Sequence, residues 1–269
     1  MKRSELNLTG FRDLHFHKKR KNQIGLHKNF NVIFPNEQVL EISSSSLYSI
    51  GSDLSAMNLK KQTKKGLTTV ESAFQSSRIY STPQGEIGPF PEYLFLTGKE
   101  CKKIVKEKSL GYHSYRYNFD GMDFFAPDYH ISLFYDYLYL NALCEDENHN
   151  VAKLLLESGY TAFTDLATLS LNSQARSAAI FISLARCGRI DEIKTYDSFL
   201  KLFRTTTDGK AIDMKSYERV QLINNKGVVN LFTPVVCNTF RRAQVETYYS
   251  KTCSCLTNKK DSNNYIDKV

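Results

Sequence analysis

The chain has 269 residues, of which 41% are hydrophobic and 24% charged, a composition typical of a globular protein with ample material for a core. No apolar run approaches the roughly 18 residues of a membrane span, and no apolar signal segment follows the charged N-terminus, so we expect a cytoplasmic protein with no membrane partner. The net charge of +8 favours an anionic partner, nucleic acid or a phosphate-bearing ligand, although surplus surface lysine would give the same charge.

The six cysteines are scattered along the chain without a C-x-x-C pair. Cys253 and Cys255 are spaced C-x-C near a polar tail, but no second cysteine pair and no nearby histidine completes a zinc site. We therefore expect free thiols in a reducing cytoplasm, no bound metal and no cofactor.

A basic run without acidic residues extends from His15 to Lys28. Such a run is usually a solvated surface, but it could also contact a phosphate backbone through charge alone. Its densest part supplies the candidate nucleic-acid contacts, which are Lys18, Lys19, Arg20 and Lys21.

Residues 39–42 alternate enough to predict a strand. Residues 51–59 are too small and polar for a core segment and predict a loop that presents side chains and backbone donors. This loop has neither the G-x-G-x-x-G spacing of dinucleotide-binding folds nor the lysine of a P-loop. A second basic cluster follows it, formed by Lys60, Lys61, Lys64 and Lys65.

The most informative stretch runs from Thr68 to Ile79 and predicts a helix. Glu71, Gln75 and Arg78 are spaced i, i+4 and i+7, so they would share one face of that helix, with Phe74 beside them. An acid, an amide and a base next to an aromatic ring suit a polar ligand pocket. The alternative is a capping box, in which Thr68 and Glu71 only close the start of their own helix.

Residues 83–91 predict a loop, and the tyrosine-rich segment from residue 111 to residue 127 predicts core or loop packing, although some of its rings could stack on a base. Apolar residues at helical spacing between residues 131 and 142 predict an amphipathic helix. Residues 151–158 predict a second helix, which Gly159 ends.

A short strand is predicted just before Asp165, which it delivers at its end. Asn172 and Ser173 are expected to cap a helix from Gln174 to Cys187, which Gly188 closes, with Gln174 and Arg176 in its first turn. Because a cation there opposes the helix dipole, we expect Arg176 to have an anionic partner. Further along, residues 220–223 and 228–233 predict a β-hairpin.

Five strings of the sequence, in this order, resemble the NADAR family, and specifically its branch paired as antitoxin with DarT-type DNA ADP-ribosyltransferase toxins. They are residues 40–44, 54–59, 70–75, 134–143 and 174–179. The resemblance implies a mainly α fold (α+β with minor short strands), with one compact NADAR-like domain over roughly residues 14–203. Residues 204–256 would form a C-terminal extension of unknown role, and residues 257–269 a disordered tail.

The resemblance further implies an enzyme that removes ADP-ribose from guanine bases in DNA and so reverses the modification made by a DarT-type toxin. Its partners would be ADP-ribosylated DNA and a DarT-type toxin. Three alternatives remain: a phage-encoded counter-defence protein with the same activity, a basic binding protein without catalysis, and an N-glycosidase acting on a small ribosylated metabolite.

Carried onto this chain, the resemblance places Glu71 at the head of the family's E-x-x-x-Q helix, Ser55 and Asn58 in a loop that faces the ligand, and Asp165 at a family carboxylate. Cleavage of an N-glycosidic bond passes through an oxocarbenium-like state. Our hypothesis gives Glu71 the acid or base role and Asp165 the role of stabilising that state or orienting water. The expected ligand-binding residues are Ser55, Asn58, Phe74, Gln75, Arg78, Gln174 and Arg176, of which the two arginines would hold pyrophosphate.

The chain departs from the family at Arg78, because the family usually has lysine seven residues after the glutamate. A lysine amine could attack C1 of the sugar and form a Schiff base, whereas arginine stays protonated. Three consequences are open: Lys60 or Lys61 supplies the amine, Arg78 only holds phosphate, or the activity is reduced.

Overall fold

A computed structural model describes residues 23–28, 30–31, 34–125, 132–165 and 173–202, and the backbone of residues 217–224 and 227–234. The predicted nucleic-acid contacts from Lys18 to Lys21 lie outside these residues, as do the predicted disordered tail and most of the predicted C-terminal extension. None of the helices in the described part has the length and apolar character that a membrane crossing requires.

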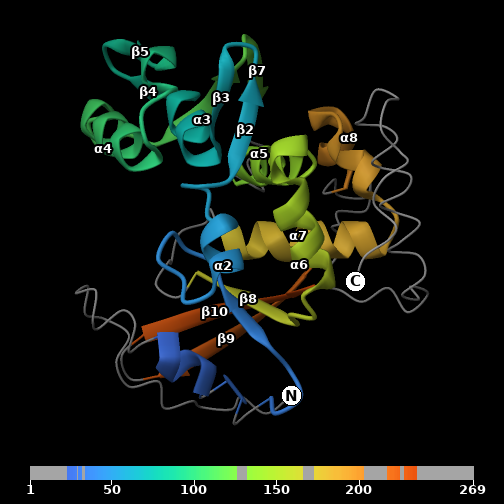
Figure 1. Cartoon of the computed structure of the whole chain (residues 1–269). Coiled ribbons are helices and arrows are strands. Elements are labelled where there is room, and N and C mark those ends of the chain that lie inside the picture. The colour runs from blue at the N-terminus through green and yellow to red at the C-terminus, as the bar shows by residue number, and fades with distance from the viewer. Residues whose placement is uncertain are drawn as a thin grey trace, which may run out of the picture.

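The first sheet has the order β1-β8-β10-β9 and lies beneath the helices in Figure 1. Its strands are β1 (Val39–Glu41), β8 (Ala162–Thr164), β9 (Tyr217–Asn224) and β10 (Gly227–Pro234). β1 and β8 are parallel, with Leu40 opposite Phe163, and β10 is antiparallel to both β8 and β9. The predicted strands at residues 39–42 and before Asp165 are therefore confirmed, as is the hairpin.

Two further sheets form the upper part of the molecule in Figure 1 together with α3 (Val70–Ser76) and α4 (Gly98–Lys108). One is the hairpin of β2 (Lys60–Thr63) and β3 (Gly66–Thr69), and the other has the order β5-β4-β6-β7. The strands of the latter are β4 (Arg78–Thr82), β5 (Gly85–Ile87), β6 (Ser114–Phe119) and β7 (Met122–Phe125), and all their pairings are antiparallel.

The prediction of a mainly α fold is wrong, because the described residues form an α+β structure with three sheets. The missed strands are short, and each lies where the sequence suggested something else. β2 lies in a lysine cluster, β4 in the expected continuation of a helix, β5 in an expected loop, and β6 and β7 in the tyrosine-rich segment. A short strand is stabilised mainly by its cross-strand neighbours, and its own sequence carries little periodic signal.

The helices at the centre of the fold agree with the sequence predictions. α5 (Leu133–Leu143), α6 (His149–Glu157) and α7 (Gln174–Arg186) are all present, and α7 begins at Ser173, whose side chain accepts from the backbone N–H of Arg176. The described part also contains α2 (Ser49–Asp53), α8 (Tyr196–Lys201), the 3-10 turns η1 (Pro91–Tyr93), η2 (Asp146–Asn148) and η3 (Ile190–Ile193), and helical residues at 23–28 and 30–31. The loop predicted at residues 51–59 therefore begins inside a short helix.

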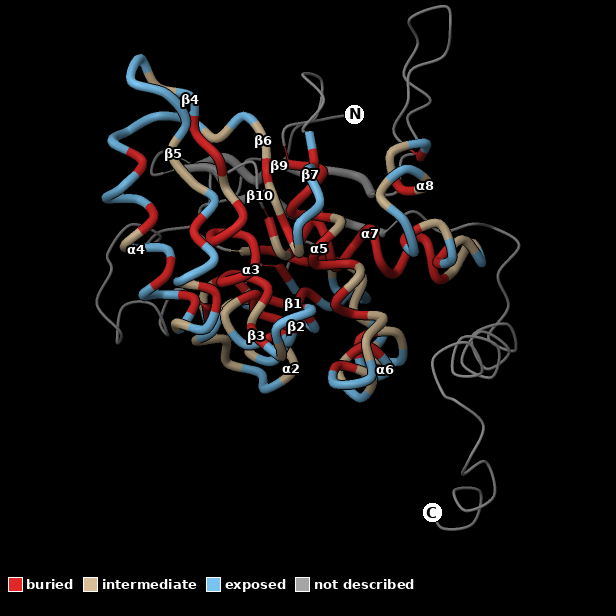
Figure 2. The backbone as a smooth tube through the Cα atoms, turned by 90° about the horizontal axis from the view of Figure 1, so that it is seen from above, coloured by how far each residue is buried: buried red, intermediate tan, exposed pale blue. Residues whose placement is uncertain are grey.

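The expected amphipathic character of α5 is wrong, because every residue of this helix except Tyr137 and Asn141 is buried. Figure 2 shows α5 and α7 as the buried centre of the molecule. Other elements cover α5 on several sides, including α3, α7 and α8. A helix in this position needs apolar side chains around most of its circumference, and its polar residues then need partners inside the protein.

Part of the tyrosine-rich segment packs into this core, as predicted. The ring of Tyr117 stacks on Phe134 of α5 with centroids 4.4 Å apart, and the ring of Phe124 lies tilted against Phe134 at 4.8 Å. Phe119 is also buried, whereas other rings of the segment, among them Tyr115 and Phe125, are exposed. The three described cysteines, Cys101, Cys144 and Cys187, are free.

Candidate functional site

The predicted capping box of Thr68 and Glu71 is wrong, because helix α3 begins one residue later than expected. Thr69 is the N-cap, and its Oγ1 accepts from the backbone N–H of Ser72 at 3.2 Å. Thr68 instead donates its hydroxyl to the carbonyl oxygen of Leu94 at 2.5 Å. Glu71 lies in the first turn of α3, where its charge suits the helix dipole, but its side chain does not close the cap.

Glu71, Gln75 and Arg78 come together as predicted, although they do not share a helix. α3 ends at Ser76 and Arg78 is the first residue of β4. The Gln75 amide nitrogen donates to Glu71 Oε1 at 3.0 Å, and an Arg78 guanidinium nitrogen donates to Gln75 Oε1 at 3.1 Å. The guanidinium also lies over the ring of Phe74, at 5.6 Å. The long arginine side chain thus reaches back to the helix, and the acid, amide and base form a continuous row.

Helix α4 completes the surroundings of Glu71 and was not anticipated from the sequence. Lys102 Nζ lies 3.3 Å from Glu71 Oε1, and 57% of the lysine side chain is exposed against 8% of the glutamate side chain. The two helices approach closely at Gly98, where an added Cβ would lie 2.9 Å from the Cβ of Glu71 and 2.8 Å from Met57 Sδ. Since atoms cannot pack at such distances, the absence of a side chain at Gly98 is what brings Lys102 to Glu71.

Tyr135 of α5 is a second residue of this site that sequence analysis missed. Its ring meets Phe74 edge-on, with centroids 5.1 Å apart, and only 3% of the residue is exposed. Burial raises the pKa of the phenol well above its ordinary value, and the negative charges of Glu71 and Asp165 raise it further. Tyr135 is therefore a protonated donor within electrostatic reach of both predicted catalytic carboxylates.

Asp165 follows β8, as predicted, and binds the start of α7. Its carboxylate accepts from the backbone N–H of Ala175 at 2.9 Å. Burial raises the pKa of this carboxyl to about 6, and nearby Glu41 adds to the effect, whereas hydrogen bonds from Ser173 and Ala175 oppose it. The group therefore changes its charge near neutral pH, which is the range in which acid–base catalysts operate.

Arg176 has the anionic partner that the helix-dipole argument predicted. One guanidinium nitrogen donates to Asp136 Oδ2 and to Ser132 Oγ, both at 2.6 Å. Asp136 is fully buried and also accepts from the hydroxyl of Ser177 at 2.7 Å. This ion pair joins α7 to α5 next to Tyr135.

Comparison with known proteins identifies the family of this chain. A model of the DarT1-associated NADAR antitoxins matches residues 1–212. The chain belongs to this family. Its members are associated with DarT1, which gives the protein an antitoxin role paired with a DarT-type toxin, and the wider NADAR family generally hydrolyses glycosidic bonds. No curated protein matches the chain.

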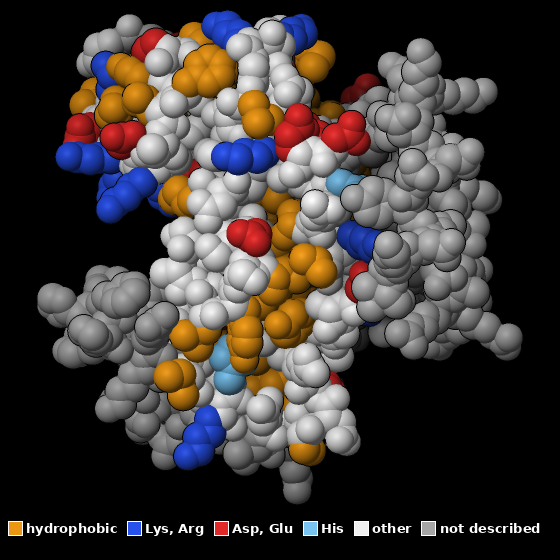
Figure 3. All heavy atoms as spheres, in the orientation of Figure 1, with side chains coloured by type: hydrophobic (Ala, Val, Ile, Leu, Met, Phe, Trp, Pro, Cys, Tyr) orange, Lys and Arg blue, Asp and Glu red, His pale blue; other side chains and the backbone are white. Residues whose placement is uncertain are grey.

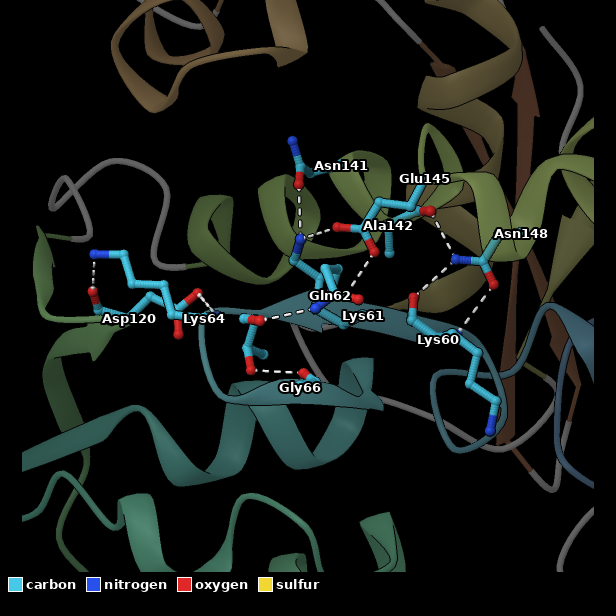
Figure 4. A network of polar contacts seen from close by, with 11 residues as sticks. Lys60, Lys61, Gln62, Lys64, Gly66, Asp120, Asn141, Ala142, Glu145 and Asn148 are labelled. Carbon is cyan, nitrogen blue, oxygen red and sulfur yellow. Dashed lines mark hydrogen bonds and ion pairs between the residues drawn. The ribbon is translucent and has the colours of Figure 1, made fainter. Parts of the chain in front are cut away.

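The lysines considered as substitutes for the family amine have other roles in the antitoxin (Figure 4). Lys61 is buried on β2, where its Nζ forms an ion pair with Glu145 and donates to Asn141 Oδ1 at 2.8 Å. Lys60 is exposed, and its backbone is held by Asn148. Lys102, by contrast, forms an ion pair with Glu71 itself.

The other predicted ligand-binding residues have partners within the antitoxin. Gln174 Oε1 accepts from the backbone N–H of Ala56 at 2.5 Å, and its amide nitrogen donates to the carbonyl oxygen of Ile42 at 3.3 Å. Ser55 is buried, while Asn58 is exposed and hydrogen-bonded to Ser52. Gln174 therefore holds Ala56, whose carbonyl oxygen accepts from the backbone N–H of Glu71. That Gln174, Ser55 and Asn58 contact a ligand stays a prediction.

Proposed function

We propose that this antitoxin is a glycohydrolase that removes ADP-ribose from guanine bases in DNA, and so reverses the modification made by a DarT-type toxin. The observation that supports it most directly is the buried Glu71 carboxylate, which is hydrogen-bonded to Gln75 and paired with Lys102. Family membership supplies the reaction class, because NADAR proteins generally cleave glycosidic bonds.

Hydrolysis breaks the bond between C1 of the ribose and the guanine nitrogen. The bonding electrons leave with guanine, which takes up a proton, and water adds its hydroxyl to C1. We assign the acid–base step to Glu71 and the stabilisation of positive charge at C1, or the orientation of water, to Asp165. Tyr135 would donate its hydroxyl to an oxygen of the substrate between them. All three assignments are proposals. The contacts of Glu71 with Gln75 and Lys102, the place of Asp165 at the end of β8 and the packing of Tyr135 against Phe74 support them.

Of the two arginines expected to hold pyrophosphate, Arg78 is better suited to the role. Its guanidinium is partly exposed and is held by neutral partners, Gln75 and Ser114. Arg176 is buried and already paired with Asp136. We therefore propose that Arg78 binds the phosphates bidentately and that Arg176 mainly positions α5 and α7.

The test is an incubation of the protein with an oligonucleotide that carries ADP-ribosylated guanine, with the products identified by mass spectrometry. We expect free ADP-ribose and an oligonucleotide with restored guanine. Release from neither DNA nor the free modified nucleoside would indicate a binding protein without catalysis. Release from the nucleoside alone would indicate a small metabolite as the substrate.

The pKa of Asp165 predicts how the reaction depends on pH. A carboxyl group with a pKa of about 6 is mostly protonated below that pH and mostly charged above it. If the charged form stabilises the cation at C1, kcat/KM rises as the pH increases through about 6. A profile from about pH 5 to about pH 8 tests this, with Asp165→Asn as the comparison. The rising limb should disappear in the variant, and a limb that persists in it would assign the titration to another group.

Tyr135→Phe tests the phenol, because it removes the hydroxyl and keeps the ring against Phe74. We expect kcat to fall about tenfold, the equivalent of one hydrogen bond worth about 1.4 kcal/mol in the transition state. Thermal melting should show nearly unchanged stability, since the phenylalanine ring keeps the packing against Phe74. Unchanged kcat together with a lower melting temperature would show a structural role only.

A further inference from the structure

The outer surface of α4 is basic along one side of the helix. Lys99, Lys102, Lys103 and Lys106 are all exposed and follow the spacing i, i+3, i+4 and i+7, which places them on one face. The neighbouring face of the helix, formed by Gly98, Cys101 and Val105, is buried. We call the four exposed residues the lysine face. Figure 3 shows basic side chains gathered over α4, at the left of the view.

Among the described residues, the acidic side chains of α4 form no ion pair with the lysine face. Glu100 is occupied by the capping box, in which it accepts from the backbone N–H and the hydroxyl of Thr97. Glu107 follows Lys103 by four residues and so lies beside it on the helix surface, but among the described residues no ion pair joins Glu107 to a lysine of this face. Within the described part of the chain, Lys102 is the member of the lysine face that has an ion pair, and its partner is Glu71.

The lysine face begins at the candidate site, because Lys102 Nζ lies 3.3 Å from the Glu71 carboxylate while most of its side chain remains exposed. From Lys99 to Lys106 the helix rises by about 10 Å. One strand of B-form DNA places about three phosphates over that length. A strand bound along the lysine face would therefore pass next to Glu71.

We propose that the lysine face binds the phosphate backbone of the DNA strand that carries the modified guanine. The inference rests on the proposed function and describes how the protein would hold its DNA substrate. Lysines without arginines or exposed aromatic rings among them are typical of contacts to phosphate, whereas protein interfaces are depleted in lysine. These contacts recognise no base, so they would hold any sequence while the residues around Glu71 recognise the ADP-ribose.

The test compares two triple variants with equal changes of charge. The first is Lys99→Gln, Lys103→Gln, Lys106→Gln, which leaves the ion pair of Lys102 intact. The control is Lys153→Gln, Lys194→Gln, Lys201→Gln, whose residues are exposed and lie outside α4 and outside the basic run from His15 to Lys28. Binding of an unmodified single-stranded oligonucleotide is measured by fluorescence anisotropy across a series of salt concentrations. The slope of log affinity against log salt should decrease by about 2 in the first variant, three contacts at about 0.7 each, and stay near wild type in the control.

A second measurement separates this inference from the proposed function. For the first variant we expect KM on ADP-ribosylated DNA to rise relative to KM on free ADP-ribosylated guanosine. An unchanged salt slope, or an equal decrease in the control, overturns the inference even if hydrolysis proceeds. Loss of binding to a DarT-type toxin with normal DNA binding would assign the lysine face to the toxin instead. If wild type hydrolyses neither substrate but the slope still decreases, DNA binding stands and the glycohydrolase proposal fails.

Discussion

Glu71→Gln is expected to reduce the release of ADP-ribose from modified DNA by between about a hundredfold and ten-thousandfold, the range for loss of a general acid or base. The amide has nearly the shape of the carboxylate, and its oxygen can still accept from the Gln75 side chain, which donates at 3.0 Å in the wild type. What it cannot do is transfer a proton. The effect should therefore appear in kcat, measured by single-turnover release of ADP-ribose, while binding of the substrate changes little.

Glu107→Gln is the matched control, because it makes the same chemical change at an exposed glutamate of α4. We expect its rate to equal that of wild type. The Glu71 variant should also melt near the wild-type temperature, since its ion pair with the exposed Lys102 contributes little to stability. Equal ADP-ribose release by Glu71→Gln and wild type would remove Glu71 from the mechanism.

Asp136→Ala is expected to lower the free energy of unfolding by about 3–5 kcal/mol, the usual cost of breaking a buried ion pair on one side. The variant leaves the Arg176 guanidinium, which is 7% exposed, without this carboxylate, and the Ser177 hydroxyl loses an acceptor. Urea unfolding measures the change. The matched control is Asp191→Ala, which removes the carboxylate of an exposed ion pair with Lys194 and should cost no more than about 0.5 kcal/mol.

The double variant Asp136→Leu, Arg176→Met distinguishes charge from packing. It removes both charges and fills the space with apolar atoms, so it should recover a large part of the stability lost in Asp136→Ala. A loss below about 1 kcal/mol in the single variant would contradict the prediction. It would show that the carboxylate contributes little net free energy in this position.

Long elements with clear end signals could be predicted from the sequence. α7 has a serine cap and a glycine beyond its end, and α6 ends before Gly159, which adopts a positive φ of 69°. These signals are local and hold in most tertiary environments. The short strands of the upper sheets could not be predicted in this way, because a segment such as β5, of three residues, forms only where β4 offers it hydrogen bonds.

The candidate site was predicted in part, and partly for the wrong reason. The row from Glu71 to Arg78 was expected from helical spacing, but it forms because the arginine side chain returns from β4 to Gln75. Lys102 and Tyr135 were missed because their positions depend on how α4 and α5 pack against α3. One local signal was available: Thr97 followed by Glu100 is a capping box that predicts the start of α4. It could not have predicted the contact with Glu71.

The pairing of β10 with β8 bears on how Asp165 is held in place. The family match ends at residue 212, whereas β10 begins at Gly227, so a strand beyond the shared region borders the strand that delivers Asp165. Without β10, the three residues of β8 would rest against β1 alone and leave an open edge. A segment beyond the family match therefore braces the strand that ends at Asp165, a carboxylate that the relatives are expected to share.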